Sequence, residues 1–307
     1  MGKIICIDSS TLFFPAVFSW ERQTLDKHKG LHNRVILPPQ YYYFNSMLSC
    51  LKKIGVEHDD MVIITLEGKS WRKDYSATYK AQRAGDRAKH TLINWDKTFE
   101  NLNNLNTALD QSTDWHFIRE WKSESDDICA MVPKVFKDKQ CVIVTGDKDL
   151  HQLAYWPNVL IFNVNKKCKG SKGMYEKIEN PLKILADKVR LGDVSDNILV
   201  DKKNDKEEDV ELRRLIIDLL KLPDYIEEAI KEILENLPEK ETNLNELPPF
   251  KGVKEKFMKI YNKDNIITPE YCYALQEKRD AKKLKIKQEK AEAKKKEMRA
   301  LIGKIWM

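Results

Sequence analysis

Residues 141–149 read Cys-Val-Ile-Val-Thr-Gly-Asp-Lys-Asp, an apolar run that ends in two carboxylates. The run is short and rich in β-branched residues, which predicts a buried strand rather than a helix over 141–145. Three other apolar runs have the same character, over residues 3–7, 61–66 and 159–163. The chain therefore contains at least four predicted buried strands.

Helix-like segments separate these strands, over residues 40–54, 95–110 and 125–137. Strands that alternate with helices predict an α/β fold, with a central, mostly parallel sheet and helices on both faces. Pro133 conflicts with the third helix, because a proline inside a helix costs about 3 kcal/mol. We expect that helix to start late or to bend.

Acidic residues follow the predicted strands at the edge where parallel sheets bind ligands. Asp8 ends the first strand, Glu67 ends the second, and two more acids follow the third. Singly, such acids are more often exposed loop residues or helix caps. Their coincidence favours one site with nine candidate metal ligands: Asp8, Glu67, Glu124, Asp126, Asp127, Asp147, Asp149, Asp193 and Asp196.

Carboxylates gathered in this way need cations between them. Two like charges about 4 Å apart repel by roughly 4 kcal/mol at an effective dielectric constant near 20. Oxygen ligands without histidine or cysteine suit Mg²⁺ or Mn²⁺. A metal-dependent phosphoryl-transfer site is therefore the first hypothesis.

Residues 68–96 interleave cations with aromatic side chains. Such a segment can neutralise phosphates and stack on unpaired bases, whereas the plainer interpretation is a solvated helical face. Its position directly after a predicted ligand strand favours the substrate interpretation. The candidate nucleic-acid contacts are Arg72, Lys73, Tyr79, Lys80, Arg83 and Arg87.

Composition limits the class of protein. The chain has 307 residues, 42% of them hydrophobic and 33% charged, with a net charge of +6. No run approaches the ~20 apolar residues of a membrane span, and the start does not read as a signal peptide. The six cysteines form no C-x-x-C pair, so we expect reduced thiols and a cytoplasmic protein. A basic surface around an acidic metal site suits nucleic acid.

Five motifs occur in order and resemble those of the flap endonuclease and 5′-nuclease superfamily, most closely bacteriophage ribonuclease H. The resemblance covers roughly residues 3–197. The motifs are Asp8 after the first strand, Tyr79-Lys80-x-x-Arg83, Glu124-x-Asp126-Asp127, Thr145-Gly146-Asp147-Lys148-Asp149-Leu150-x-Gln152-Leu153 and Gly192-Asp193-x-x-Asp196-Asn197.

The resemblance implies a PIN-like nuclease core with two Mg²⁺ ions, for which Mn²⁺ can substitute. Asp8, Glu124, Asp126, Asp147 and Asp149 would form the centre of the metal site, completed or supported by Asp127, Asp193 and Asp196. Lys80 and Arg83 would be catalytic residues in a helical arch or clamp. The implied activity is 5′-3′ exonuclease and flap endonuclease cleavage of RNase H type, which removes RNA primers or 5′ flaps during DNA replication or repair.

The expected organisation has three parts. Residues 1–197 form the nuclease core, with the basic arch inserted at about 68–96. Residues 198–276 form a helical DNA-binding region, with amphipathic helices near 210–221 and 223–236. Residues 277–307 form a basic tail, either a long exposed helix or disordered.

Two departures from the family pattern qualify the resemblance. The second strand ends in Glu67 rather than Asp, and Leu199 to Lys203 replace the usual hairpin that grips duplex phosphates. A PIN-type RNA endonuclease and a non-catalytic nucleic-acid scaffold are the alternatives. The expected partners are a DNA or RNA/DNA duplex with a 5′ end or flap, and a single-strand-binding protein or sliding clamp, with the protein acting as a monomer.

Overall fold

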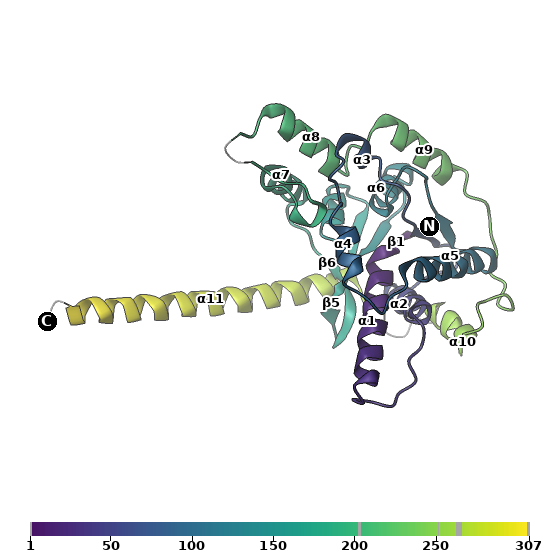
Figure 1. Ribbon diagram of the computed structural model, residues 1–307, viewed down its shortest axis with the longest axis horizontal. Helices are drawn as coiled ribbons and strands as arrows, with labels where there is room; N and C mark the ends of the chain where they lie inside the picture. Colours follow the sequence, from purple (N-terminus) through teal and green to yellow (C-terminus); the bar gives the residue numbers. More distant parts are fainter. Residues whose placement is uncertain (1, 202–203, 251, 262–265, 306–307) are drawn as a thin grey trace.

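The structure, a computed structural model, describes residues 2–201, 204–250, 252–261 and 266–305, with side chains described up to residue 293. A sheet lies at its centre, with helices around it (Figure 1). The sheet has six strands in the order β3-β2-β1-β4-β5-β6. β6 pairs antiparallel with β5, and the other neighbours pair in parallel. The strands are β1 (Ile4–Asp8), β2 (Met61–Thr65), β3 (His116–Ile118), β4 (Cys141–Thr145), β5 (Val159–Cys168) and β6 (Ser171–Glu176).

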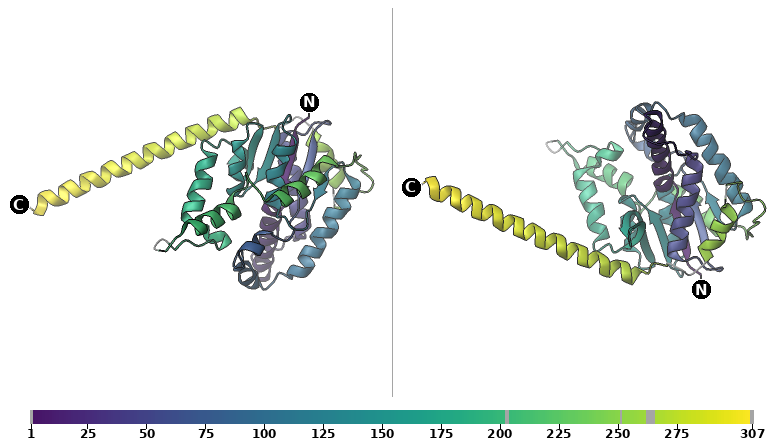
Figure 2. Two further views of the ribbon diagram at one scale, coloured as in Figure 1. Left: turned by 90° about the horizontal axis from the view of Figure 1, so that it is seen from above. Right: turned by 90° about the horizontal axis from the view of Figure 1, so that it is seen from below.

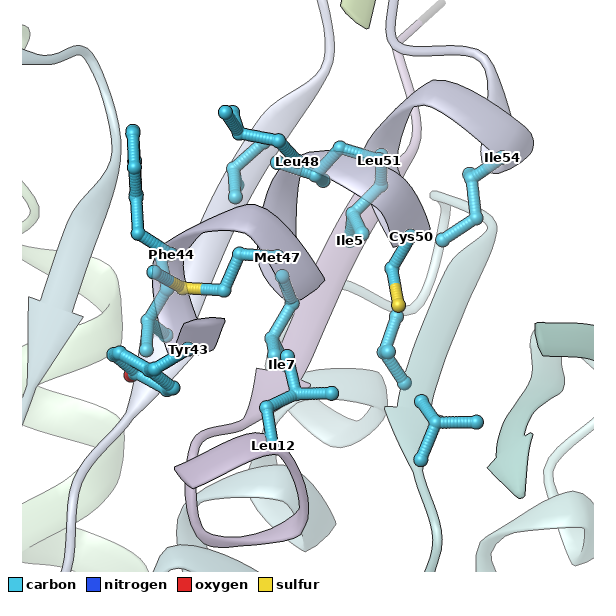
Figure 3. Packing of buried hydrophobic residues seen from close by; sticks show 14 of the residues in the cluster. Ile5, Ile7, Leu12, Tyr43, Phe44, Met47, Leu48, Cys50, Leu51 and Ile54 are labelled. Atoms are coloured by element: carbon cyan, nitrogen blue, oxygen red, sulfur yellow. The ribbon is translucent and has the colours of Figure 1, made fainter. Parts of the chain in front are cut away.

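The central strands are apolar on both sides because both faces of the sheet are covered. In β1, Ile5 and Ile7 belong to one buried cluster, whereas Ile4 and Cys6 belong to the other. Figure 3 shows the first cluster, in which side chains of α2, among them Met47, pack over β1. This alternation fixes the register of β1, since a shift by one residue would exchange its two faces.

Helices cover the two faces from different parts of the chain. α1 (Ser10–His28), α2 (Pro39–Ile54) and α5 (Trp95–Ser112) contribute to the first cluster. α6 (Ser125–Val135) and α9 (Asp224–Glu235) contribute to the second. The predicted α/β fold class is confirmed, and α9 packs on the nuclease core itself.

The remaining elements lie around this core. Within residues 68–96, the helices are short: α3 (Arg72–Tyr75) and α4 (Arg83–Ala88). α7 (Pro181–Leu191), α8 (Glu207–Ile217) and α10 (Val253–Met258) follow, and α11 (Pro269–Ile305) leaves the body as a single long helix (Figures 1 and 2). In the described part of the chain, no helix is both long and apolar enough to cross a membrane.

Several expectations about elements need correction. The predicted helices did not include α1 or α7, and the predicted strands did not include β3 or β6. α8 begins at Glu207 and ends at Ile217, so both of its ends lie before those of the helix expected near 210–221. α6 starts at Ser125, and not late as expected. The helix accommodates Pro133 because this proline lies in the last turn, where the missing N–H removes only one hydrogen bond near the helix end. All six cysteines are buried and free, as expected for reduced thiols.

Candidate metal centre

A hollow of about 510 Å³ opens at the carboxyl edge of the sheet. Its acidic lining residues are Asp8 at the end of β1 and Asp147 and Asp149 after β4. β1 and β4 are adjacent parallel strands, so their carboxyl ends lie side by side. The arrangement expected from the strand ends therefore holds for these three acids.

Asp126 joins this group from the first turn of α6. Burial raises its pKa well above the usual range, and the nearby carboxylates of Asp8 and Asp147 raise it further. Burial and Asp147 likewise raise the pKa of Asp8, against hydrogen bonds that lower it. Carboxyl groups that oppose one another's ionisation form a set of hard oxygen donors that suits a hard divalent cation.

Three hydroxyl groups hold Asp8 in place. Ser10 Oγ and Ser125 Oγ donate to its Oδ1 over 2.8 and 2.9 Å, and Thr145 Oγ1 donates to its Oδ2 over 3.3 Å. Thr65 Oγ1 lies 2.6 Å from Ser125 Oγ and extends the network below the acid. These hydroxyls were not predicted, although each of them lies within two residues of a predicted ligand.

Glu124 lies between the acids and the basic segment. Its carboxylate accepts from Lys80 Nζ at 2.7 Å, Tyr79 Oη at 2.9 Å and Arg72 Nη1 at 3.1 Å. Burial opposes its ionisation, but Lys80 and Arg72 outweigh burial and bring its pKa to about 2. Glu124 is therefore ionised and presents a charge toward Lys80.

Glu67 lines a neighbouring hollow, which shares Ser10 and Phe14 with the one above the acids. Its Oε2 accepts from the Ser125 backbone N–H at 3.4 Å. Desolvation and the carboxylate of Glu124 raise its pKa to about 7, although Lys80 counteracts them. The longer side chain thus reaches the first turn of α6 from β2.

Asp127 points away from this group. Its carboxylate accepts from Arg72 at 2.7 and 3.0 Å, from Trp71 Nε1 at 3.2 Å and from the Glu124 N–H at 2.9 Å. Arg72 itself is 2% exposed and also donates to the carbonyl of Ile216. The expectation that Arg72 contacts nucleic acid does not fit this position, and the carboxylate of Asp127 is engaged in a buried ion pair.

A second group of acids lies beside the first. One oxygen each of Asp149, Asp193 and Asp196 lies within 4.8 Å of the others, so that the three could hold a cation. Lys188 of α7 contacts both Asp149 and Asp193. Desolvation and Asp147 raise the pKa of Asp149 to about 6 in spite of this lysine. Lys188 was not predicted: Asp193 follows α7 directly in the chain, but only the tertiary structure brings Lys188 to Asp149.

The basic segment is bound to the loop that carries Asp196. Lys80 has a left-handed backbone conformation with φ of 55°, uncommon for a residue with a side chain. Its N–H donates to the carbonyl of Asp196 at 3.0 Å, and Asn197 Nδ2 donates to the carbonyl of Thr78 at 2.9 Å. Tyr79, 3% exposed, donates to Asp196 as well as Glu124, so it is a structural member of the site rather than a free aromatic surface.

The other predicted cations lie at different depths. Arg83 pairs with Asp196 at 3.0 Å, yet its side chain stays 45% exposed. Arg87 is half-buried over the rings of Trp95 and Phe99. Lys73 is exposed on α3. Besides the buried Arg72, Lys80 and Arg83 are thus the cations of residues 68–96 that contact predicted metal ligands.

Residues 3–179 match the family described as 5′-3′ exonuclease, N-terminal resolvase-like domain. The chain belongs to this family. It is therefore an enzyme, a metal-dependent nuclease that hydrolyses phosphodiester bonds, in agreement with the prediction from the carboxylates. A comparison with curated protein sequences gave no significant match.

Comparison with solved structures gave matches of low sequence identity. The T5 D15 protein co-crystallised with metal ions is 15% identical, with 88% of this chain and 91% of that chain covered and a TM-score of 0.48. Human GEN1 in complex with Holliday junction DNA is 13% identical, with coverage of 84% and 71% and a TM-score of 0.43. The catalytic core of Rad2 in complex with DNA substrate is 15% identical, with coverage of 87% and 80% and a TM-score of 0.35.

Lys80→Ala, which removes the ammonium group, is expected to lower the single-turnover rate of cleavage by about a hundredfold. The reason is its place between Glu124 and Asp196, where it can stabilise charge that develops on a phosphate. Arg83→Ala should have the same effect but smaller, since Arg83 is more exposed. Rapid-quench experiments at saturating enzyme measure the cleavage rate of each variant, and a separate binding experiment measures its affinity for the duplex.

Lys89→Ala is the matched control from the same segment, because Lys89 is exposed and pairs with Asp86 at 2.7 Å. It should leave the saturated rate unchanged. A Lys80 variant that binds duplex weakly but cleaves at the normal saturated rate would make Lys80 a phosphate anchor without a catalytic role.

Proposed function

We propose that the protein is a Mg²⁺-dependent 5′-3′ exonuclease and flap endonuclease with RNase H-type activity. Its substrate would be a DNA or RNA/DNA duplex with a 5′ end or flap. One observation carries this proposal: two clusters of acidic residues lie at the sheet edge, and the basic segment of residues 68–96 is hydrogen-bonded to the loop that carries Asp196. The proposed role is removal of RNA primers or 5′ flaps during replication or repair.

Two cation positions follow from the two groups of acids. Asp8, Asp126 and Asp147 would hold one ion, with Glu67 and Glu124 beside it, and Asp149, Asp193 and Asp196 would hold the other. Divalent ions in such a site supply a reactive hydroxide and neutralise charge on the phosphate. Lys188 would have to release Asp149 and Asp193 as the second position fills.

The chain's own groups orient the substrate. Lys80 and Arg83 place positive charge at the entrance, so that a phosphate can approach acids that would otherwise repel it. The hydroxyls around Asp8 keep one carboxylate in a fixed orientation. We propose that residues 198–276 and the exposed lysines of α11 add contacts with duplex phosphates, in the place of the missing hairpin.

Cleavage of a 5′-labelled flap duplex tests this function. With Mg²⁺, we expect short labelled products from DNA flaps and from RNA/DNA hybrids, and with chelator we expect none. A 3′-labelled duplex and a blocked 5′ end show whether cleavage starts from the 5′ end. Cleavage of single-stranded RNA in preference to either duplex would favour the PIN-type alternative, and binding without cleavage in Mg²⁺ or Mn²⁺ would favour a scaffold.

A further inference from the structure

Side chains of two other elements bind the backbone of Gly146, the residue directly before Asp147. The Gly146 N–H donates to Thr11 Oγ1 of α1 at 2.5 Å, and its carbonyl accepts from Asn165 Nδ2 of β5 at 3.2 Å. Thr11 and Asn165 both line the hollow that contains the acids. Neither residue is a predicted metal ligand or one of the hydroxyls around Asp8.

These two contacts leave no room for a side chain at position 146. A Cβ atom on Gly146 would lie 2.5 Å from Asn165 Nδ2 and 2.6 Å from Thr11 Oγ1, closer than atoms that are not bonded can approach. Glycine is the residue that permits such a close approach to the backbone. The pair of contacts therefore depends on the glycine of the motif that carries Asp147.

An irregularity in β5 brings Asn165 to this place. Between Asn163 and Lys167, three residues of β5 lie opposite one residue of β6. Bulges of this kind bend a strand and change the direction of its side chains, and they are frequent next to active sites. Asn165 is one of the three residues, and its side chain reaches the loop after β4.

A group of polar side chains outside the acid hollow fixes the bulge. Asn163, 6% exposed, accepts the Asn165 N–H on its Oδ1 at 2.8 Å and donates to Glu176 Oε2 of β6 at 2.6 Å. The same carboxylate pairs with Lys166 Nζ at 2.6 Å. Glu176 therefore connects two residues of the irregular part of β5 to β6, and this fixes the backbone of Asn165.

The orientation of Gly146 determines where the acids of its loop lie. Gly146 and Asp147 share a planar peptide bond, so a fixed Gly146 carbonyl also fixes the Asp147 N–H. That N–H donates to Thr145 Oγ1 at 2.9 Å, and Asp147 Oδ1 accepts the Asp149 N–H at 2.9 Å. A shift of Gly146 would therefore move both Asp147 and Asp149.

We propose that Thr11 and Asn165 are positioning residues of the metal site, which fix Asp147 through the backbone of Gly146. This rests on the proposed function, since it requires a divalent ion at Asp147. Loss of a group that orients a metal ligand typically lowers metal affinity or activity by about 10- to 100-fold. The effect of Thr11 and Asn165 passes through the Asp147 carboxylate and not through a contact with substrate.

Thr11→Val keeps the shape of the side chain but leaves the Gly146 N–H without its acceptor. We expect it to bind Mn²⁺ about tenfold more weakly than the native protein does, in the absence of nucleic acid. Electron paramagnetic resonance of the free ion measures this affinity without any cleavage. Asn165→Ala should have the same effect but smaller, because Asn165 is exposed and its hydrogen bond is longer.

Thr11→Ser keeps the hydroxyl group and should restore native Mn²⁺ affinity. Thr24→Val is the matched control, since Thr24 lies on the same helix, donates to the carbonyl of Trp20 at 2.9 Å and does not line the acid hollow. It should bind Mn²⁺ like the native protein. Equal thermal midpoints establish that these variants fold, and the exposed Asn165 supplies a variant whose folding does not depend on the replaced side chain.

A double-mutant cycle shows whether Thr11 acts through Asp147. If it does, Thr11→Val should weaken Mn²⁺ binding by less than about twofold when Asp147 is already replaced by asparagine. A general loosening of the structure would instead lower the affinity by the same factor in both backgrounds. That equal loss would overturn the proposal.

Two further results would also overturn it. One is native Mn²⁺ affinity in both Thr11→Val and Asn165→Ala. The other is weaker binding of a flap substrate in chelator with unchanged Mn²⁺ affinity, which would make Thr11 and Asn165 substrate contacts. The proposed function fails separately, if Mg²⁺ supports no cleavage of any flap while Mn²⁺ binding still depends on Thr11.

Discussion

Asp147→Asn is expected to lower the rate of flap cleavage by about a thousandfold at saturating Mg²⁺, while affinity for the duplex persists. The carboxamide keeps the shape of the side chain, and its oxygen can still accept the Asp149 N–H, which lies 2.9 Å from Asp147 Oδ1. What disappears is the charge that raises the pKa of Asp8 and Asp126 and that a cation would bind. A loss of about 4 kcal/mol in the transition state corresponds to this factor.

Single-turnover cleavage and anisotropy in chelator measure the two quantities separately. Asp138→Asn is the control, because Asp138 is exposed just before β4, at the opposite end of the same strand. It should cleave at the native rate. A rate for Asp147→Asn within about threefold of the native protein would remove Asp147 from the metal site.

Arg72→Ala is expected to lower the free energy of unfolding by about 3–5 kcal/mol. The guanidinium group lies between Glu124 and Asp127. Asp127 is 0% exposed, so removal of the guanidinium group leaves a buried carboxylate without its cation. An unpaired buried charge costs far more than the pair itself contributes. Thermal and denaturant unfolding, followed by circular dichroism, measure the effect.

Lys73→Ala, from the exposed face of the same helix, should change stability by about 0.5 kcal/mol or less. Arg72→Ala combined with Asp127→Asn should recover part of the loss, since the second change removes the stranded charge. If the double variant is no more stable than Arg72→Ala, packing rather than charge causes the loss.

Asp127→Asn alone should retain far more cleavage than Asp147→Asn, because Asp127 faces Arg72.

The sheet was predictable because its signal is local. Each of β1, β2 and β4 is a short β-branched run, and buried strands of a parallel sheet are apolar on both faces. The acids Asp8 and Asp147 were predictable for the same reason, since a strand end fixes where the next residue lies. β6 was missed because it is an edge strand with polar residues, and α1 was missed because Pro15 interrupts its helical pattern.

The parts of the site that were missed depend on contacts between distant segments. Arg72 has the sequence context of a surface cation, and only the packing of α3 against α6 buries it on Asp127. Lys188 comes from a helix that was not predicted, and only the tertiary structure brings it to Asp149, whereas Asp193 directly follows that helix. No spacing in the sequence shows which acids face each other and which face an arginine.

α11 has a consequence for the hydrodynamics of the molecule. Arg279 donates to the carbonyl of Lys167 at 2.8 Å, and beyond it the helix leaves the body (Figure 1). Its 37 residues span about 55 Å, whereas a compact chain of this length has a radius of gyration of about 19 Å. Such a projection slows tumbling and advances elution from a gel-filtration column, so a single copy will run like a heavier particle. Light scattering, which reads mass directly, is therefore the appropriate measure of how many chains associate.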